Sequence, residues 1–227
     1  LTEREDNGMI ELKNVVKVYN ADDTSVKALD NISIKIDDGE YIAVMGRSGS
    51  GKSTLLNIIG GMEKVTSGQY FCNEKEISSL TIKELDLFRK NNISFIFQNY
   101  FLINSYTVSE NIEVPLIAKG IPVKKRKNIV DEMMKKTGIS DIAKKYPNHI
   151  SGGQMQRCAI SRALASDNRI ILADEPTGAL DAKTGQEIME LLNNIKTKGK
   201  TIILVTHDEN IASYADRIVR IENGKIV

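Results

Sequence analysis

The sequence predicts an α/β protein with a mostly parallel core sheet, an antiparallel β subdomain and an inserted α-helical subdomain. Three apolar runs are separated by long helical stretches, as the crossover connections of a parallel sheet require. These runs are Ile93–Gln98, Arg169–Asp174 and Thr201–Thr206. Three other runs follow one another closely, as in antiparallel hairpins: Ile10–Tyr19, Ile32–Ile36 and Tyr41–Met45. From residue 99 to residue 150 helical periodicity replaces the strand signals.

Two of the runs show no alternation of apolar and polar residues. They read Ile-Ile-Leu-Ala at 170–173 and Ile-Ile-Leu-Val at 202–205, which is typical of strands buried on both faces. Near the end of the sequence, Asn223-Gly224 separates Arg217–Glu222 from Lys225–Val227 and predicts a hairpin turn.

Three helix starts carry capping-box patterns, in which side chains satisfy free N–H groups of the first turn. They are Thr81-x-x-Glu84, Thr107-x-x-Glu110 and Ser151-x-x-Gln154. One predicted helix has an apolar stripe that we interpret as core packing, formed by Ile129, Val130, Met133 and Met134. We therefore predict a helical subdomain at Asn99–Ala165, inserted in a core made of residues 9–98 and 166–227. Residues 1–8 are interpreted as a leader or a cloning remnant.

The composition is ordinary for a globular protein, with 41% hydrophobic and 27% charged residues in a chain of 227. The formal charge of +1, from 31 basic and 30 acidic side chains, argues against a surface built to hold nucleic acid. Cys72 and Cys158 lie far apart and lack zinc-site spacing, so we interpret both as buried packing residues in a reducing cytosol. No apolar run approaches the length of a membrane-spanning helix, so any membrane role would require a partner.

A glycine-rich loop follows the strand predicted at Tyr41–Met45 and precedes a predicted helix. It has the spacing GxxxxGKS and comprises Gly46, Arg47, Ser48, Gly49, Ser50, Gly51, Lys52 and Ser53, with Thr54 next. Backbone N–H groups of such a loop, together with the helix N-terminus, bind phosphates. Lys52 is expected to reach the β- and γ-phosphates of ATP, and Ser53 is expected to bind Mg²⁺. A small-molecule kinase, a GTPase, a helicase and a transporter motor all fit this loop taken alone.

Further functional side chains are predicted where three buried strands end, since those ends face the same crevice as the phosphate loop. Asp174 would hold Mg²⁺, and Glu175 would orient and deprotonate the attacking water. His207 would contact the γ-phosphate. Gln98 would reach Mg²⁺ or the water through its amide. The weaker alternative for the two carboxylates is an exposed acidic turn before a proline.

A second phosphate-binding device is predicted at a helix start that lacks both a lysine and a metal ligand. It consists of Ser151, Gly152, Gly153 and Gln154. Taken alone, this segment could also be an ordinary glycine-containing helix cap.

The order of these motifs resembles the ABC ATPase family, in which a P-loop NTPase core carries these site residues. The family signature LSGGQ appears as ISGGQ, with Ile150 replacing the usual leucine without loss of a hydrogen-bond donor. The resemblance covers essentially all of Met9–Val227. It implies ATP hydrolysis to ADP and phosphate, with Mg²⁺ as cofactor, in a head-to-tail homodimer. Each signature, at Ser151–Gln154, would then complete the ATP site of the opposite subunit.

The same resemblance implies roles for two more residues. Asp181, in Gly178-Ala179-Leu180-Asp181, corresponds to an aspartate that contacts the other subunit of the dimer. Tyr19 corresponds to the aromatic residue that stacks on adenine, although without the family it would be interpreted as an ordinary strand residue.

Within that family the sequence is most similar to ATPases that serve bacterial lipoprotein release, macrolide export and antimicrobial-peptide resistance. The similar stretches are Val26–Asp30, Phe95–Gln98, Asn111–Leu116 and Ala173–Gly178. The resemblance implies a peripheral motor subunit on the cytoplasmic face of the bacterial membrane. It would drive a separate transmembrane permease that exports or extracts a peptide, an antibiotic or a lipid-like substrate. It implies no nucleic-acid partner.

Two alternatives remain open. One is an ABC protein that acts on ribosomes or DNA, although such proteins carry two cassettes or long coiled-coil insertions that this sequence lacks. The other is an ATP-binding regulatory or scaffold subunit of a membrane complex without transport.

An apolar cluster directly after Gln98 is a candidate docking surface for the membrane partner. It comprises Tyr100, Phe101, Leu102 and Tyr106. If exposed, it would form a patch of the kind that binds other proteins. The alternative is that these side chains belong to the core of the helical subdomain.

Overall fold

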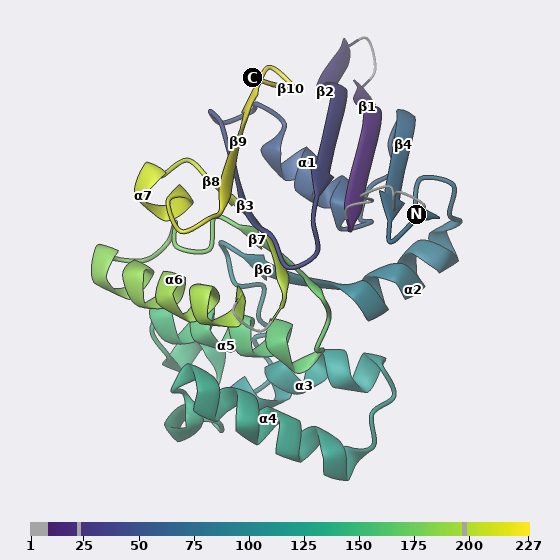
Figure 1. The fold of residues 1–227 in the computed structure, drawn as a ribbon. Helices are drawn as coiled ribbons and strands as arrows, with labels where there is room; N and C mark the ends of the chain where they lie inside the picture. The colour runs from purple at the N-terminus through teal and green to yellow at the C-terminus, as the bar shows by residue number, and fades with distance from the viewer. Residues whose placement is uncertain (1–8, 22–23, 197–198) are drawn as a thin grey trace, which may run out of the picture. The chain divides into compact units, whose positions relative to one another are not determined.

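In the computed structural model, residues 9–21, 24–196 and 199–227 are described. They divide into two units, one within Leu1–Arg89 and Gly199–Val227, the other within Lys90–Lys198. The leader or cloning remnant predicted at 1–8 lies outside the described residues. Figure 1 shows the ribbon with most of the helices and strands labelled.

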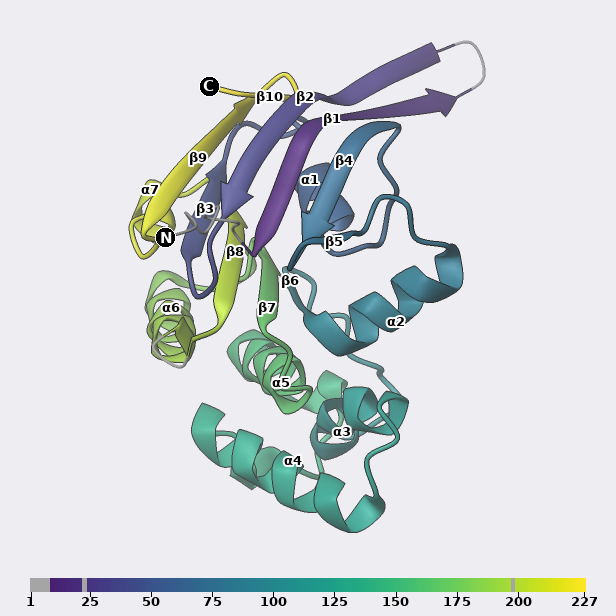
Figure 2. The ribbon, with the colours of Figure 1, turned by 45° about the vertical axis from the view of Figure 1, so that its right-hand side comes forward.

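The first unit contains an antiparallel sheet in the order β2-β1-β4-β5. The strands are β1 (Ile10–Ala21), β2 (Thr24–Ile36), β4 (Ser67–Cys72) and β5 (Lys75–Glu76). Ile10 lies opposite Ile36 on one side and Cys72 on the other, and all three side chains are buried. The last residue of β1 that pairs with β4 is Val16, so the β1–β2 hairpin continues beyond β4 (Figure 2).

Two expectations for this region were incomplete. β2 begins at Thr24 rather than at Ile32, and its first half was missed because Lys27, Asp30 and Asn31 interrupt the apolar pattern of the strand. β4 and β5 were not predicted, because they are short and mostly polar and owe their form to pairing with β1 and with each other.

The same unit contains a set of parallel strands. β3 (Tyr41–Met45) pairs in parallel with β8 (Thr201–Thr206) and with β9 (Arg217–Glu222). The prediction that β3 belongs to an antiparallel hairpin was therefore wrong, since closeness in sequence does not reveal which sheet a strand joins. β3 and β8 are buried throughout, which confirms the prediction of a strand buried on both faces for β8.

The predicted hairpin at Asn223-Gly224 is confirmed, since β10 (Lys225–Ile226) pairs antiparallel with β9. Helix α1 (Lys52–Ile59) follows β3 and buries Leu55, Leu56 and Ile58. The short helix α7 (Glu209–Ala212) follows β8 and is capped by Asp208, which accepts hydrogen bonds from two backbone N–H groups. Helix α2 (Ile82–Asn92) begins with the predicted pair Thr81 and Glu84, which exchange hydrogen bonds.

The second unit combines two parallel strands with the main group of helices. β6 (Ile93–Phe97) pairs with β7 (Ile170–Asp174). The helices are α3 (Val108–Ala118), α4 (Val123–Thr137), η1 (Ser140–Ile142), η2 (Pro147–His149), α5 (Gly152–Ala165) and α6 (Ala182–Lys196). The capping boxes predicted at the starts of α3 and α5 are both present.

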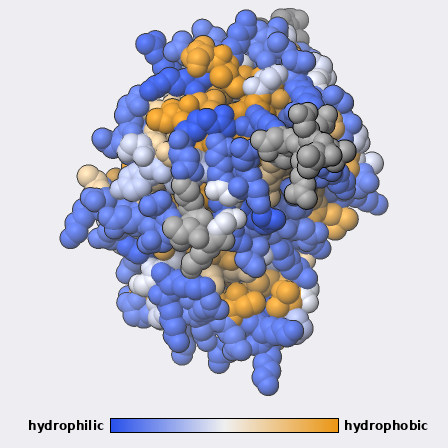
Figure 3. Space-filling view, viewed as in Figure 1, coloured by the Kyte–Doolittle hydropathy of each residue, from blue (hydrophilic) through white to orange (hydrophobic). Residues whose placement is uncertain are grey.

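The core of these helices contains the apolar stripe that the sequence predicted on α4. Val130, Met133 and Met134 are buried there and pack with residues of α3 and with Cys158 of α5. The opposite face of α4 is charged, and Figure 3 shows the corresponding region as hydrophilic. Among the described residues, no helix combines the length and the apolar character that crossing a membrane would require.

Candidate functional site

The glycine-rich loop of the first unit connects β3 to α1 and is closed by glycines at both ends. A Cβ at Gly46 would lie 2.2 Å from the carbonyl oxygen of Ile221, and one at Gly51 would lie 2.4 Å from that of Ala28. Gly51 also has a φ of 106°, which L side chains rarely adopt. A side chain at either position would push the backbone away from its neighbours, so the loop conformation depends on these glycines.

Lys52 lies at the first position of α1 and is buried, with 7% of its surface exposed. Its Nζ donates hydrogen bonds to the carbonyl oxygens of Gly46 and Arg47, each at 2.8 Å. The ammonium therefore lies inside the loop, beside the free N–H groups of a helix N-terminus. A buried cation next to such N–H groups forms an anion site, and a phosphate group has the required charge and acceptors.

The turn between β9 and β10 supports the loop at Ser50. The N–H of Gly224 donates to the carbonyl of Ser50 at 3.0 Å, and the carbonyl of Gly224 accepts from the N–H of Asp30 at 2.8 Å. A pocket of about 280 Å³ lies between this turn and the loop and is lined by Arg47, Ser48, Gly49, Ser50, Ile221, Glu222 and Asn223. The conformation of the phosphate loop therefore depends on contacts from a hairpin far away in the sequence.

His207 follows β8, the strand that pairs with the strand leading into the loop. β3 and β8 run in parallel with Met45 opposite Thr206, so the residues that follow each strand emerge at one edge of the sheet. Met45 leads into the loop and Thr206 leads into His207, which is exposed. This confirms that His207 follows a buried strand, as the sequence predicted.

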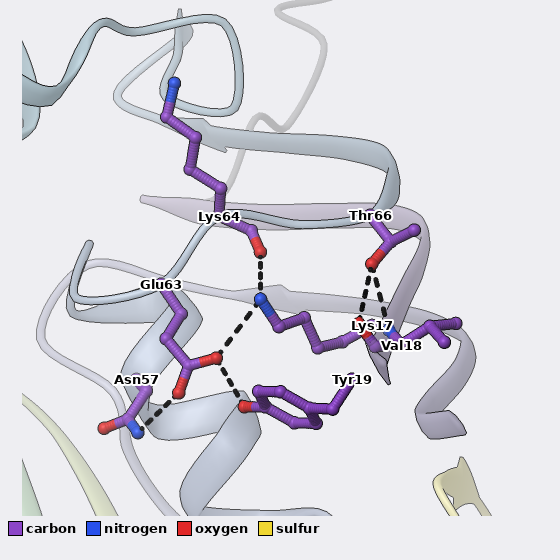
Figure 4. A network of polar contacts seen from close by, with 7 residues as sticks. All are labelled: Lys17, Val18, Tyr19, Asn57, Glu63, Lys64 and Thr66. Carbon is purple, nitrogen blue, oxygen red and sulfur yellow. Dashed lines mark hydrogen bonds and ion pairs between the residues drawn. The ribbon is translucent and has the colours of Figure 1, made fainter. Parts of the chain in front are cut away.

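Tyr19, the predicted base-stacking residue, lies on the part of β1 that extends beyond β4, with 38% of its surface exposed. Its hydroxyl donates a hydrogen bond to the carboxylate of Glu63, and the Nζ of Lys17 lies 4.9 Å from the centre of its ring. Figure 4 shows these side chains together. Sequence reasoning did not single out Glu63 or Lys17, because no motif links residue 63 to residue 19.

In the second unit, Gln98 and the two carboxylates follow neighbouring strands. β6 and β7 pair with Phe97 opposite Asp174, so Gln98 and Glu175 each come directly after that pair. A Cβ at Gly178 would lie 2.8 Å from Nε2 of Gln98 and 3.3 Å from Oε2 of Glu175, so both side chains approach the same point. Glu175 has a φ of 44°, an uncommon conformation for a residue other than glycine and one that is often found at functional sites.

The signature segment caps α5. The Ser151 hydroxyl accepts from the N–H of Gln154 at 3.3 Å, and the Gln154 side chain accepts from the N–H of Ser151 at 3.0 Å. The glycines lie close to other residues of the same unit, since a Cβ at Gly152 would be 3.0 Å from the Tyr100 hydroxyl. The segment is therefore a helix cap, as the alternative predicted. Ser151 is nevertheless exposed at the start of the helix.

Asp181 also caps a helix, a role that sequence reasoning missed. Its carboxylate accepts a hydrogen bond from the N–H of Thr184 at 3.0 Å in the first turn of α6. Hydrogen bonds from Thr184 hold the pKa of Asp181 below its usual value, although the carboxylate is exposed. The signal was present in the sequence, since an aspartate before a helical stretch is a common N-cap.

The family model for ABC transporters matches residues 29–178, about two thirds of the chain. The chain belongs to the ABC transporter family. The macrolide export ATP-binding/permease protein MacB of Hyphomonas neptunium is 42% identical over 219 residues, and so is MacB of Escherichia coli strain K12. Each match covers 96% of this chain and 34% of the relative, so the chain spans about a third of the length of these proteins.

Solved structures of ABC cassettes have the same fold. A dimeric structure of the ATP-binding cassette MJ0796 in a post-hydrolysis state with ADP and Pi has a TM-score of 0.90 and 43% identity, and covers 96% of each chain. CbiO1 from Clostridium perfringens, part of the ABC transporter complex CbiONQ, has a TM-score of 0.86 and 30% identity, covering 97% of this chain and 87% of that one. The predicted fold class is confirmed, and this ABC cassette is an ATPase.

The predicted metal ligands of this ABC cassette suit Mg²⁺. Ser53 offers a hydroxyl in the first turn of α1, Asp174 a carboxylate at the end of β7, and Gln98 an amide oxygen after β6. Mg²⁺ prefers oxygen donors and is usually held by one or two carboxylates together with substrate phosphates. Within the described part of the chain, no three His, Cys, Asp or Glu residues form a cluster that could hold a metal.

The segment after Gln98 in the ABC cassette has an unusual backbone. Tyr100 and Phe101 have φ values of 60° and 44°, and Arg162 of α5 donates to both of their carbonyl oxygens at 2.6 Å. Burial lowers the pKa of Arg162 below its usual value. The fully buried Asn111 holds the other end of the segment through hydrogen bonds to Ile103 and Tyr106.

The predicted docking cluster is only partly exposed. Phe101 and Tyr106 are 62% and 41% exposed, whereas Leu102 packs against the helical core. For Leu102 the alternative of core packing is therefore favoured, since its side chain is half-buried against that core. Ile103, which the prediction left out, is 39% exposed and takes its place.

Proposed function

We propose that this chain is the motor subunit of a bacterial ABC transporter, which dimerises around two Mg-ATP molecules and drives a membrane-spanning permease. The observation that carries this proposal is that a buried lysine in a glycine-rich loop and a carboxylate directly after a buried strand occur in one chain. A buried lysine lies in a phosphate loop, and Glu175 follows a buried strand next to Asp174. A chain that only bound ATP would not need a carboxylate at position 175.

In this mechanism, Lys52 and the N–H groups of the loop bind the β- and γ-phosphates and neutralise the charge that develops during transfer. Tyr19 stacks on the adenine. Ser53, Asp174 and Gln98 would hold Mg²⁺, which would neutralise phosphate charge when bound. Glu175 accepts a proton from the attacking water, and His207 and Gln98 orient the γ-phosphate and that water.

In the proposed dimer, the signature of one subunit completes the ATP site of the other. Ser151 and Gly153 would donate hydrogen bonds to the γ-phosphate bound by the partner, and Asp181 would contact the partner's loop. Support comes from the exposed Ser151 at a helix N-terminus and from the dimeric state named for the similar MJ0796 cassette. The helical subdomain at 99–165, which carries the signature, stays a prediction.

The relatives support a proposal for the partner and the cargo. The MacB proteins are described as macrolide export ATP-binding/permease proteins, and this chain matches about a third of each. These names place the ATP-binding and permease parts in one protein, and we propose that this cassette works with a permease as a peripheral subunit at the cytoplasmic face of the membrane. The proposed cargo is a peptide, an antibiotic or a lipid-like molecule.

The test separates ATP binding from hydrolysis. Lys52→Ala removes a charged donor to the phosphates and should weaken ATP affinity by about 10- to 100-fold. Glu175→Gln should keep ATP binding but lower turnover by about 10²- to 10⁴-fold, the usual contribution of a general base. Binding by calorimetry and phosphate release should be measured on both variants. Wild-type turnover in Glu175→Gln would exclude this residue as the base, and unchanged ATP affinity in Lys52→Ala would exclude the loop as the phosphate site.

A further inference from the structure

The ring of Tyr19 is held by a network that connects β1 to the segment after α1. The Tyr19 hydroxyl donates to Oε2 of Glu63, and the Lys17 ammonium lies 3.2 Å from the same oxygen. Lys17 also donates to the carbonyl of Lys64 at 2.9 Å. In Figure 4, Tyr19 and Lys17 both point toward the carboxylate of Glu63.

Glu63 is fixed to α1 through Asn57. The Asn57 Nδ2 donates to Oε1 of Glu63 at 3.0 Å, and the backbone N–H of Glu63 donates to the Asn57 carbonyl at 3.3 Å. α1 begins with Lys52 and Ser53 of the phosphate loop. The Tyr19 ring is therefore linked, through Glu63 and Asn57, to the helix that carries the proposed phosphate ligands.

The carboxylate of Glu63 is charged within this network. Burial raises the pKa of Glu63, but hydrogen bonds from Tyr19, Asn57 and Lys17 outweigh it and hold this pKa below the usual value. Glu63 is therefore ionised at neutral pH. The stabilisation that ionised Glu63 gives the network is complete above the usual carboxyl pKa. It is lost as the pH falls through the lowered pKa of Glu63.

The Tyr19 ring stays partly exposed. The Lys17 ammonium lies over the ring, yet 38% of the Tyr19 surface is exposed. β4 pairs with β1 only as far as Val16, so among the described strands β2 alone pairs with β1 at position 19. The side chain of Thr66 instead accepts from the N–H of Val18 at 2.9 Å, which fixes the backbone next to the ring. A planar base can stack on a ring that is fixed and still partly exposed.

We propose that Glu63 and Lys17 are positioning residues for nucleotide binding, which hold the Tyr19 ring ready for the adenine of ATP. This inference rests on the stacking role given to Tyr19 in the proposed function. A ring fixed before binding loses less conformational freedom when the base arrives, which is worth about two- to tenfold in affinity for one ordered side chain. The effect is specific to ligands that carry a base, because Glu63 does not donate to phosphates.

The experiment compares Mg-ATP with magnesium tripolyphosphate, which has the phosphates but no base. Binding of both is measured by calorimetry at neutral pH. Glu63→Ala should weaken ATP binding about two- to tenfold and leave tripolyphosphate binding unchanged. Glu63→Gln, which keeps a hydrogen-bond acceptor, should recover part of the ATP affinity. Glu11→Ala is the matched control, since it removes another glutamate of the same unit, one that pairs with Lys13 instead.

Tyr19→Phe tests the hydrogen bond from the other end. It keeps the ring but removes the hydroxyl, so it should weaken ATP binding to a similar degree. The double variant Tyr19→Phe/Glu63→Ala should bind ATP about as tightly as either single variant, because both changes break the same hydrogen bond. Fully additive losses would overturn the proposal.

A spectroscopic measurement checks the ring directly. The chain has no tryptophan, so Tyr19→Trp introduces a single indole whose fluorescence should be quenched by ATP and not by tripolyphosphate.

Three further outcomes would overturn the inference. Unchanged ATP affinity in Glu63→Ala would show that the network does not position the ring. An equal loss for ATP and tripolyphosphate would show that Glu63 acts on the phosphate loop. Unchanged ATP affinity in Tyr19→Ala would remove the stacking role itself, while the effects of Lys52→Ala and Glu175→Gln would still decide separately whether the chain is the proposed motor.

Discussion

Lys52 is a buried ammonium whose hydrogen bonds go to two carbonyl groups of its own loop. The sequence predicted its role because the lysine and the glycines that shape the loop are only a few positions apart. Glu175 was predicted for a similar reason, since a carboxylate directly after a buried strand lies at the carboxyl end of the sheet, where ligands bind. Its left-handed backbone was not predicted, because a φ of 44° at a glutamate depends on the surrounding structure.

The two cysteines give a prediction at the same scale. Burial raises the pKa of Cys72 to about 11 and that of Cys158 to about 12, from an ordinary value of 9.0. Their contribution to stability is complete below pH 9.0 and is lost as the pH rises through these values, because the unfolded chain loses its thiol protons first. At pH 10 this should lower the free energy of unfolding by about 1 kcal/mol per thiol.

Urea unfolding at pH 8 and pH 10 measures this effect. A Cys72→Ala/Cys158→Ala variant should lose less stability between the two pH values than the unchanged chain does. The comparison uses the slope with pH, because alanine at these positions also changes packing at every pH. Equal slopes in both chains would contradict the buried, protonated state of the thiols.

The segment between β6 and α3 presents exposed apolar side chains that could contact another protein. Arg162 and Asn111 hold its two ends, so its exposed apolar side chains are presented on an ordered backbone. Phe101, Ile103 and Tyr106 are all exposed, directly after the proposed water-orienting Gln98. We expect a cytoplasmic segment of the permease to dock there, which would place the contact next to the chemistry of ATP.

Charged substitutions test this surface. Phe101→Glu/Tyr106→Glu should abolish co-purification with the permease and leave ATP turnover of the isolated cassette within about twofold, since surface changes cost little stability. Ile117→Glu is the matched control, because Ile117 lies on α3 in the same unit and is 51% exposed. A complex that survives the double change, or is lost equally in the control, would place the docking surface elsewhere.

The whole chain is proposed to act as a dimer that forms with ATP and separates after hydrolysis. Glu175→Gln should trap this dimer, because the bound ATP is not cleaved and one negative charge beside the γ-phosphate is removed. The unchanged chain should dimerise only transiently, and ADP should support no dimer. Size-exclusion chromatography with light scattering, with Mg²⁺ and either nucleotide, measures the mass directly.

Adding Ser151→Arg to Glu175→Gln tests the shared site. The arginine should block the signature from the partner's γ-phosphate, so the trapped dimer should be lost while each subunit still binds ATP. A trapped dimer that persists in the double variant would argue against a signature that serves the opposite subunit. Loss of ATP binding would instead assign Ser151 to the nucleotide of its own chain.

Measurements on the whole chain also distinguish the alternative functions. An ABC protein acting on ribosomes or DNA would show ATP turnover that responds to nucleic acid, whereas the near-neutral formal charge of +1 favours no such partner. A regulatory or scaffold subunit would bind ATP and dimerise, but would complete no transport cycle with its membrane partner.

The sequence alone determined the parts of this protein whose signals are local. The phosphate loop, the signature, the capping boxes and the buried strand at Thr201–Thr206 each lie within a short stretch, so spacing and apolar pattern were sufficient. Only the tertiary structure decided that β3 joins parallel strands, that Leu102 packs against the helical core, and that Glu63 accepts a hydrogen bond from Tyr19. These depend on contacts between residues tens to more than a hundred positions apart, which pairing and packing create and no local pattern encodes.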